Sequence, residues 1–296
     1  MTITADIWVS AILGAVVSAV FAGTIALLHR TYRIMRRLSA VRRLLGPLGQ
    51  DMPVAFFSKR LYSQNREYLS DVPNYFPPHT QGQTSIHRNI PYVVGTAQME
   101  AAADIMHLLG RAGRHSGVQY LSADTDWDVW DKHLFAVGGS HKTEAILSSC
   151  EPRLVELARQ EIQGTYTIGF KLTNSDEFFP AVNGNDYGLI LKATYPPTGV
   201  QCFVLMGIGS LGTEAAAYFL RNNAVMLGRA YGGRSFTVLV HCRLQQGKQS
   251  ARLHRWNPTP AWTRVIRYPS LWAEYRRIER MSNKTNSADA KSRAAD

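Results

Sequence analysis

The residues of this chain best suited to chemistry are glycines placed between an apolar stretch and a helical pattern. In the segment VQCFVLMGIGSLGTEAAAYFLR, residues 200–221, three glycines follow the spacing G-x-G-x-x-G. Glycines at this spacing let a strand turn tightly into a helix, whose first N–H groups then face a bound phosphate. We therefore expect a phosphate contact from Gly207, Gly209, Ser210, Gly212 and Thr213.

A second glycine turn, GGSHKT at residues 138–143, also stands between an apolar stretch and a helical pattern. Its expected ligand-binding residues are Gly138, Gly139, Ser140, His141, Lys142 and Thr143. The turn is not a Walker A motif, because Ala136 and His141 stand where that motif has glycines. This departure disfavours a P-loop ATPase. The structural alternative is a plain turn in which Ser140 or Thr143 caps the helix.

A third junction carries Gly95 and Thr96, and Asp124 closes the strand expected next along the chain. Its position resembles that of the ribose-binding carboxylate of a Rossmann unit. Asp124 also belongs to an acidic loop that a solvated surface would explain equally well. If the three strands are neighbours, their junctions converge at one edge of the sheet. The expected ligand is a nucleotide or another phosphorylated small molecule, and the sequence identifies no particular cofactor.

Four side chains near these turns have the chemistry of a general acid or base, namely Glu100, His141, Asp186 and Glu214. They support the alternative that the chain is an enzyme that cleaves or transfers part of a nucleotide. Each also has a structural explanation, since a carboxylate is favoured at a helix start and Asp186 lies in a turn-forming segment. No metal site is expected, because the histidines and the three cysteines lack ligand spacing.

Alternating strand and helix patterns over residues 90–243 resemble the Rossmann-like α/β fold, although they point to no narrower family. We expect a mostly parallel sheet with helices on both faces. The expected strands are residues 92–95, 118–121, 134–137 and 235–242, together with the apolar stretch after residue 200. Residues 153–163 are expected to form a helix, and residues 166–172 and 187–194 an antiparallel hairpin.

Residues 7–28 contain no charged side chain and are long enough to cross the roughly 30 Å hydrocarbon core of a bilayer. A cleavable signal peptide is disfavoured, because only Asp6 precedes the apolar run where a basic segment would be needed. The positive charge follows the run instead, at Arg30, Arg33, Arg36, Arg37, Arg42 and Arg43. The positive-inside rule then predicts a single-pass protein of the inner cell membrane, with its N-terminus outside and its main domain cytoplasmic.

The expected organisation is a transmembrane helix (residues 1–30), a basic juxtamembrane helix and linker (31–89), the α/β domain (90–243), a basic aromatic segment (244–281) and a disordered tail (282–296). The formal net charge of +11 suits an anionic membrane surface or a nucleic acid. The first arginine cluster directly follows the apolar run, which favours the lipid of the inner leaflet over nucleic acid. Small residues recur every fourth position, at Gly14, Ser18, Ala22 and Ala26, and could pair two copies as a homo-oligomer.

Taken together, these features predict a membrane-anchored cytoplasmic sensor or effector that binds a nucleotide or another phosphorylated small ligand. Two alternatives remain open at this stage. One is the tethered nucleotide-cleaving or nucleotide-transferring enzyme, and the other is a non-catalytic structural protein that assembles at the membrane.

Overall fold

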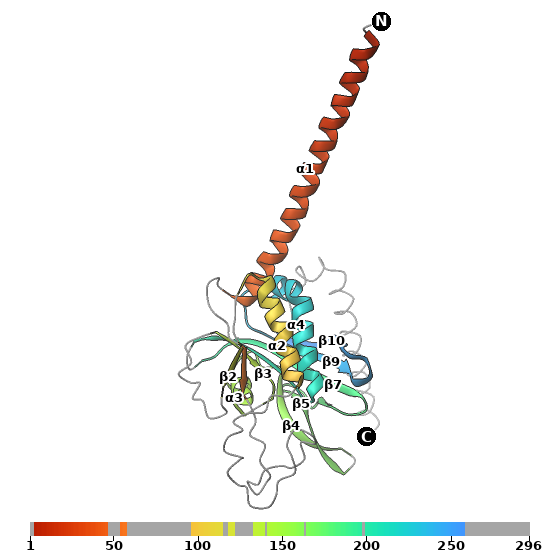
Figure 1. Cartoon of the computed structure of the whole chain (residues 1–296). Coiled ribbons are helices and arrows are strands. Elements are labelled where there is room, and N and C mark those ends of the chain that lie inside the picture. Colours follow the sequence, from red (N-terminus) through yellow and green to blue (C-terminus); the bar gives the residue numbers. More distant parts are fainter. Residues whose placement is uncertain are drawn as a thin grey trace, which may run out of the picture.

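The computed structural model describes residues 3–46, 54–57, 96–114, 118–121, 133–139, 141–162, 164–196 and 199–257. Figure 1 shows one long helix that projects from an α/β domain. This helix, α1, comprises Ile3–Leu45. Its 43 residues correspond to a length of about 65 Å at about 1.5 Å per residue.

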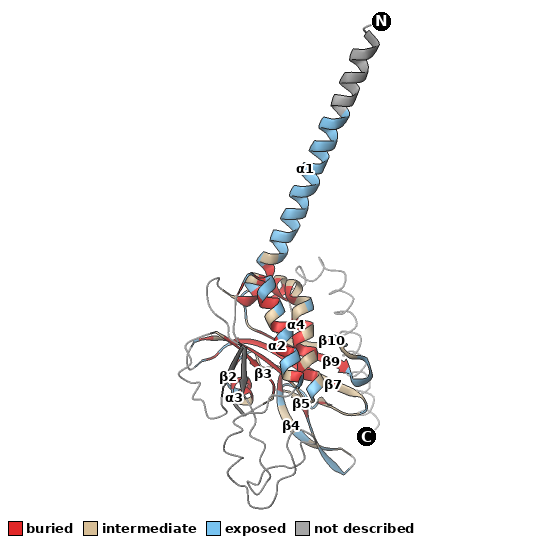
Figure 2. Ribbon diagram, in the orientation of Figure 1, coloured by how far each residue is buried: buried red, intermediate tan, exposed pale blue. Residues whose placement is uncertain are grey.

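Helix α1 has two parts with opposite surroundings. The described side chains from Ala15 to Arg37 are all exposed, whereas Ala40, Val41, Leu44 and Leu45 are buried in the domain (Figure 2). The buried positions lie on one face of the helix, as the 3.6-residue period requires. In the described part of the chain, α1 is the one helix long and apolar enough to cross a membrane.

The domain is organised around a mixed sheet of seven strands. Their order across the sheet is β10 (Gly247–Asn257), β9 (Phe236–Arg243), β7 (Asn185–Thr194), β8 (Gln201–Gly207), β3 (Leu134–Val137), β1 (Val54–Phe57) and β2 (Val118–Leu121). From β2 to β8 the neighbouring strands run parallel. From β8 to β10 each strand is antiparallel to its neighbour.

Helices cover one face of this sheet. Helix α2 (Thr96–Arg111) and helix α4 (Ser210–Ala230) pack side by side on it, with the buried end of α1 beside them (Figure 1). Their apolar faces form one core with inward side chains of β3, β8 and β9, including Phe135, Phe203 and Phe236. The alternation of inward and outward residues along each strand places the neighbouring residues on the other face.

A second, smaller layer covers the other face. Helix α3 (His141–Ser149) lies there with an antiparallel sheet of β4 (Val155–Ile162), β5 (Thr165–Leu172) and β6 (Phe178–Pro180). The second core includes Ile146, Val155, Phe170 and Leu191. The domain therefore has three layers, with the seven-stranded sheet in the middle.

The predicted Rossmann-like, mostly parallel sheet is wrong. Among the described strands, five of the eight pairings are antiparallel and three are parallel. The pattern around residues 200–242 was assigned to the correct elements, since β8, α4 and β9 follow one another. However, β7 inserts between β8 and β9 and is antiparallel to both. Such an insertion comes from long-range pairing and leaves no local pattern in the sequence.

Two further expectations about local structure are also wrong. Residues predicted as the helix 153–163 form strand β4, which pairs with β5 from Val155 to Ile162. Residues in this stretch favour helices, but Gly164, with φ of +77°, turns the chain back so that the hairpin pairing prevails. The predicted hairpin of residues 166–172 and 187–194 does not form, because β5 and β7 belong to different sheets.

Two strands of the large sheet were not expected. Strand β1 lies within the predicted linker and pairs with both β2 and β3. Strand β10 pairs with β9 and lies within the predicted basic aromatic segment, for which no strand was expected. The predicted strand at residues 92–95, the end of the basic aromatic segment after residue 257 and the predicted tail at residues 282–296 lie outside the described residues.

Helices α1 and α4 cross in close contact at Gly228. A Cβ atom on Gly228 would overlap the backbone carbonyl of Ala40. Glycine is therefore the residue that lets the base of α1 pack directly on the backbone of α4.

We predict that Gly228→Ala destabilises the domain by about 1–3 kcal/mol, the usual cost of overpacking, and lowers its thermal unfolding midpoint. The matched control is Gly110→Ala in α2, because a Cβ at Gly110 meets no atom within 4 Å. Alanine at that exposed helical position should stabilise the chain by up to about 1 kcal/mol. Equal midpoints for the two variants in thermal denaturation would contradict the close crossing.

Candidate functional site

The glycine turn after β8 is organised around the carboxylate of Asp186, at the start of β7. Asp186 Oδ1 accepts a hydrogen bond from Gly209 N at 2.9 Å, and Oδ2 accepts one from Gly212 N at 2.7 Å. These N–H groups lie at the N-terminus of α4, where backbone donors have no partner within the helix. The side chain of Asp186 is 1% exposed. An internal carboxylate thus occupies the place at which a phosphate was expected, and a phosphate would have to displace it.

Close backbone packing adds a second role for this turn. A Cβ atom on Gly212 would overlap the carbonyl of Tyr187, so the first turn of α4 lies against the backbone of β7. Thr213 is buried, while Ser210 is exposed and Gly207 and Gly209 are half-buried. The geometry of Gly207, Gly209 and Gly212 is therefore explained by contacts within the protein, and a phosphate contact there remains a prediction.

The other end of α4 is matched by positive charge. Lys192, also on β7, donates from Nζ to Gly232 O at 3.4 Å, and Arg234 donates to Ala230 O at 3.2 Å. Lys192 is fully buried, and burial lowers its pKa to about 8. Carbonyl groups at a helix C-terminus favour cations just as the N–H groups at the other end favour anions. Strand β7 therefore carries a charge suited to each end of α4.

The turn after β3 lies beside the turn after β8. The amide of Gly138 donates to Leu205 O at 2.8 Å, so the two junctions are neighbours at one edge of the sheet, as expected. Thr143 is buried and Thr96 is the exposed first residue of α2. Gly95, Asp124 and Ser140 lie outside the described residues, as do the side chains of His141 and Lys142. Ligand binding by these residues remains a prediction.

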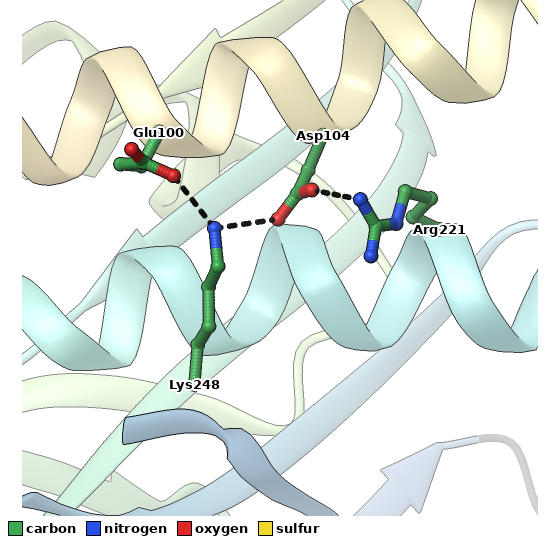
Figure 3. A network of polar contacts seen from close by, with 4 residues as sticks. All are labelled: Glu100, Asp104, Arg221 and Lys248. Carbon is green, nitrogen blue, oxygen red and sulfur yellow. Dashed lines mark hydrogen bonds and ion pairs between the residues drawn. The ribbon is translucent and has the colours of Figure 1, made fainter.

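Glu100, one of the carboxylates predicted as an acid or base, belongs to an ion-pair network between elements of the fold. Lys248 Nζ of β10 lies 2.7 Å from Glu100 Oε2 and 3.4 Å from Asp104 Oδ2, and Arg221 lies 2.5 Å from Asp104 Oδ1 (Figure 3). This network joins α2, α4 and β10. Its hydrogen bond from Lys248 lowers the pKa of Glu100. Burial raises the pKa of Glu214, on α4, while the charge of Lys248 opposes the rise.

A cavity of about 450 Å³ lies on the opposite face of the sheet from these helices. It is formed by the start of β7, the end of β9, β10 and the turn between β9 and β10. Its lining residues are Tyr187, His241, Arg243, Gln246, Ser250, Arg252 and His254. None of the described lining residues carries a carboxylate. The cavity therefore has the electrostatic character of an anion site.

Three of the lining residues are half-buried rings, Tyr187, His241 and His254. The ring centroid of Tyr187 lies 5.2 Å from that of His241 and 5.5 Å from that of His254. Phe179 of β6 packs against Tyr187 at 5.4 Å and edge-on against His254 at 4.9 Å. Asn185 Oδ1 lies 2.9 Å from His241 Nε2 and helps to orient that ring. Burial raises the pKa of Tyr187, so its phenol stays neutral at physiological pH.

Two exposed arginines stand at the mouth of the cavity. In the described part of the chain, the guanidinium groups of Arg243 and Arg252 make no hydrogen bond or ion pair. By contrast, Nη2 of nearby Arg255 lies 2.9 Å from Glu177 Oε2, so its positive charge is balanced by a carboxylate. Unpaired guanidinium groups are well suited to phosphate and carboxylate groups, to which they donate in pairs.

Sequence reasoning reached one of these residues. Arg243 is the last residue of the predicted α/β domain and directly follows a predicted strand, so a phosphate contact from it was conceivable, whereas Arg252 and His254 lie in the basic aromatic segment, for which no strand was predicted. The missed signal is the alternation of polar and apolar residues in SARLH, positions 250–254, shortly after the turn at Gly247, which is typical of a strand. A bulge near His254 then interrupts the alternation.

The chain matches no protein-family model, no curated protein and no solved structure. Its function is therefore inferred from its own residues.

We predict that Asp186→Asn destabilises the domain by about 1–3 kcal/mol, because one carboxylate oxygen is replaced by an amide that cannot accept from a backbone N–H. The comparison variant is Asp176→Asn, whose carboxylate is fully exposed in a surface ion pair with Lys171. That change should cost less than about 1 kcal/mol. Thermal unfolding of both full-length variants in detergent checks the difference. Similar unfolding midpoints for the two variants would mean that the Asp186 hydrogen bonds contribute little to the stability of the domain.

Proposed function

We propose that this protein is a membrane-anchored sensor or effector that binds a small phosphorylated ligand in the cavity between β7, β9 and β10. The observation that supports this is two guanidinium groups, on Arg243 and Arg252, that have no partner among the described residues and lie at a cavity whose described lining has no carboxylate. The cavity volume of about 450 Å³ lies within the range of about 300–1,000 Å³ that is usual for small-molecule sites.

The proposed membrane anchor is the exposed half of α1. Its large apolar side chains, including Val17, Val20, Phe21, Leu27 and Leu28, are each more than 50% exposed. An apolar surface of this kind on an isolated helix is unfavourable in water unless another apolar phase or partner covers it. The apolar part of the helix is long enough to cross a bilayer. By the positive-inside rule, the arginines that follow favour a domain on the cytoplasmic side of the inner membrane, beside anionic lipid. Pairing of two anchors through their small residues would make the protein a homo-oligomer.

Helix α4 offers the physical connection that a sensor needs. Tyr187 lines the cavity, and the adjacent Asp186 holds the N-terminus of α4 on the other face of the sheet. Near its C-terminus the same helix crosses α1 at Gly228. In this proposal, a ligand that moves Tyr187 also acts on the end of α4, which contacts the base of the membrane helix.

The binding proposal predicts that a phosphorylated probe stabilises the full-length chain in detergent. The probes are inorganic phosphate, pyrophosphate and ribose 5-phosphate, followed by thermal unfolding and calorimetric titration. Arg243→Gln and Arg252→Gln should each weaken binding roughly ten- to hundredfold, because each removes a charge-assisted hydrogen bond.

The matched control for these variants is Arg159→Gln, which removes an exposed arginine of β4 that does not line the cavity. Its affinity should equal that of the unchanged chain. If no phosphorylated probe binds, or if all three variants weaken binding equally, the cavity is not the site.

The membrane proposal predicts that the chain remains in the membrane fraction after alkaline extraction and that a reporter fused to its C-terminus reports the cytoplasm. Replacing Val20 and Phe21 with aspartate should release the chain, because charge near the centre of a bilayer is costly. The comparison change is Arg36→Gln with Arg37→Gln, which leaves the apolar run intact. An extracellular reporter signal would overturn the proposed orientation.

A further inference from the structure

The cavity presents aromatic rings and guanidinium groups, the two kinds of side chain that a nucleotide would need. The register of three strands places them in a row. Tyr187 of β7 is paired with His241 of β9, and His241 is paired with Arg252 of β10. All three line the cavity. A ring, a second ring and a guanidinium therefore follow one another across the sheet.

The spacing of the row is set by the geometry of a sheet. Neighbouring strands lie about 4.8 Å apart, so Tyr187 and Arg252, two strands apart, are separated by roughly 10 Å. A base stacked near Tyr187 and a phosphate held by Arg252 would be joined by a ribose between them. Inorganic phosphate would use the arginine end alone.

The environment of Tyr187 suits it to stacking. Its ring is half-buried and is supported by Phe179 and His254, which limits the freedom it must lose when a ligand binds. Stacking of a base on an aromatic side chain requires no particular base, because every base has a π face. The exposed amide of Gln246 also lines the cavity, and it offers both a donor and an acceptor to the edge of a base.

The second arginine strengthens the phosphate end. Arg243 is paired with Asn185 in the register, and its backbone N–H donates to Ser250 Oγ at 2.8 Å. Ser250 Oγ in turn lies 2.7 Å from Gly247 O, so this hydroxyl is engaged in holding the turn between β9 and β10. The turn thus fixes the backbone from which the Arg243 guanidinium extends.

From this arrangement we infer that the ligand of the cavity is a mononucleotide, with its base stacked on Tyr187 and its phosphate held by Arg243 and Arg252. The inference rests on the proposed binding of a phosphorylated ligand and adds the chemical class of that ligand.

The test is calorimetric titration of the full-length chain in detergent with AMP, GMP, CMP and UMP, compared with ribose 5-phosphate and inorganic phosphate. At least one nucleotide should bind roughly tenfold or more tightly than ribose 5-phosphate, which is the contribution expected from stacking one base. Tyr187→Leu should abolish that preference and leave the affinity for ribose 5-phosphate unchanged. Tyr187→Phe, which keeps the ring, should retain the preference.

Three results would overturn the inference in distinguishable ways. If ribose 5-phosphate binds as tightly as every nucleotide, the inference fails and the proposed phosphate-binding function stands. If Tyr187→Leu keeps the nucleotide preference, the base lies elsewhere and the assignment of Tyr187 fails. If none of the six probes binds, both the inference and the proposed function fail.

Discussion

The bond between the Asp186 carboxylate and the N-terminus of α4 is the interaction on which the domain depends. It satisfies backbone donors that would otherwise be buried without an acceptor, which is among the costliest defects in a protein interior. It also fixes β7 against α4, so that β7 lies between β8 and β9 although the chain passes directly from β8 through α4 to β9. Lys192 on the same strand meets the other end of the helix. One strand thus complements the whole dipole of α4.

The same strand divides its residues between two tasks. Because side chains alternate along β7, Asp186 faces the helices while Tyr187 faces the cavity. Scaffold and candidate site are therefore adjacent in the sequence but lie on opposite faces of the sheet. This division separates the glycine turn after β8, whose amides are held by Asp186, from the cavity surface on which Arg243 and Arg252 have no partner among the described residues.

Local patterns predicted a good part of the secondary structure. Helices α2 and α4 and strands β2, β3, β8 and β9 follow apolar periodicities that were read correctly. The sheet topology could not be obtained in this way, because the order of strands depends on partners distant in the chain. Strand β4 shows the same limit, since its helix-favouring residues are held extended by pairing with β5.

The candidate site was predicted only in part, for a related reason. The glycine spacing indicated free N–H groups at a helix start, and the structure has those groups at Gly209 and Gly212. Their acceptor comes from 23 and 26 residues away, so no short motif could reveal it. The cavity residues of β10 were missed because the polar and apolar residues alternate only over positions 250–254 before a bulge near His254 interrupts the pattern by which a strand is recognised.

Helix α1 passes without interruption from its exposed apolar half into the core at Ala40. A continuous helix transmits rotation and tilt along its axis, whereas a loop at this position would absorb them. The direction in which the cavity opens is consequently determined by the tilt and rotation of the exposed half of α1, because no flexible loop separates the two. Any surface that binds the exposed half of α1 would therefore also set the orientation of the domain.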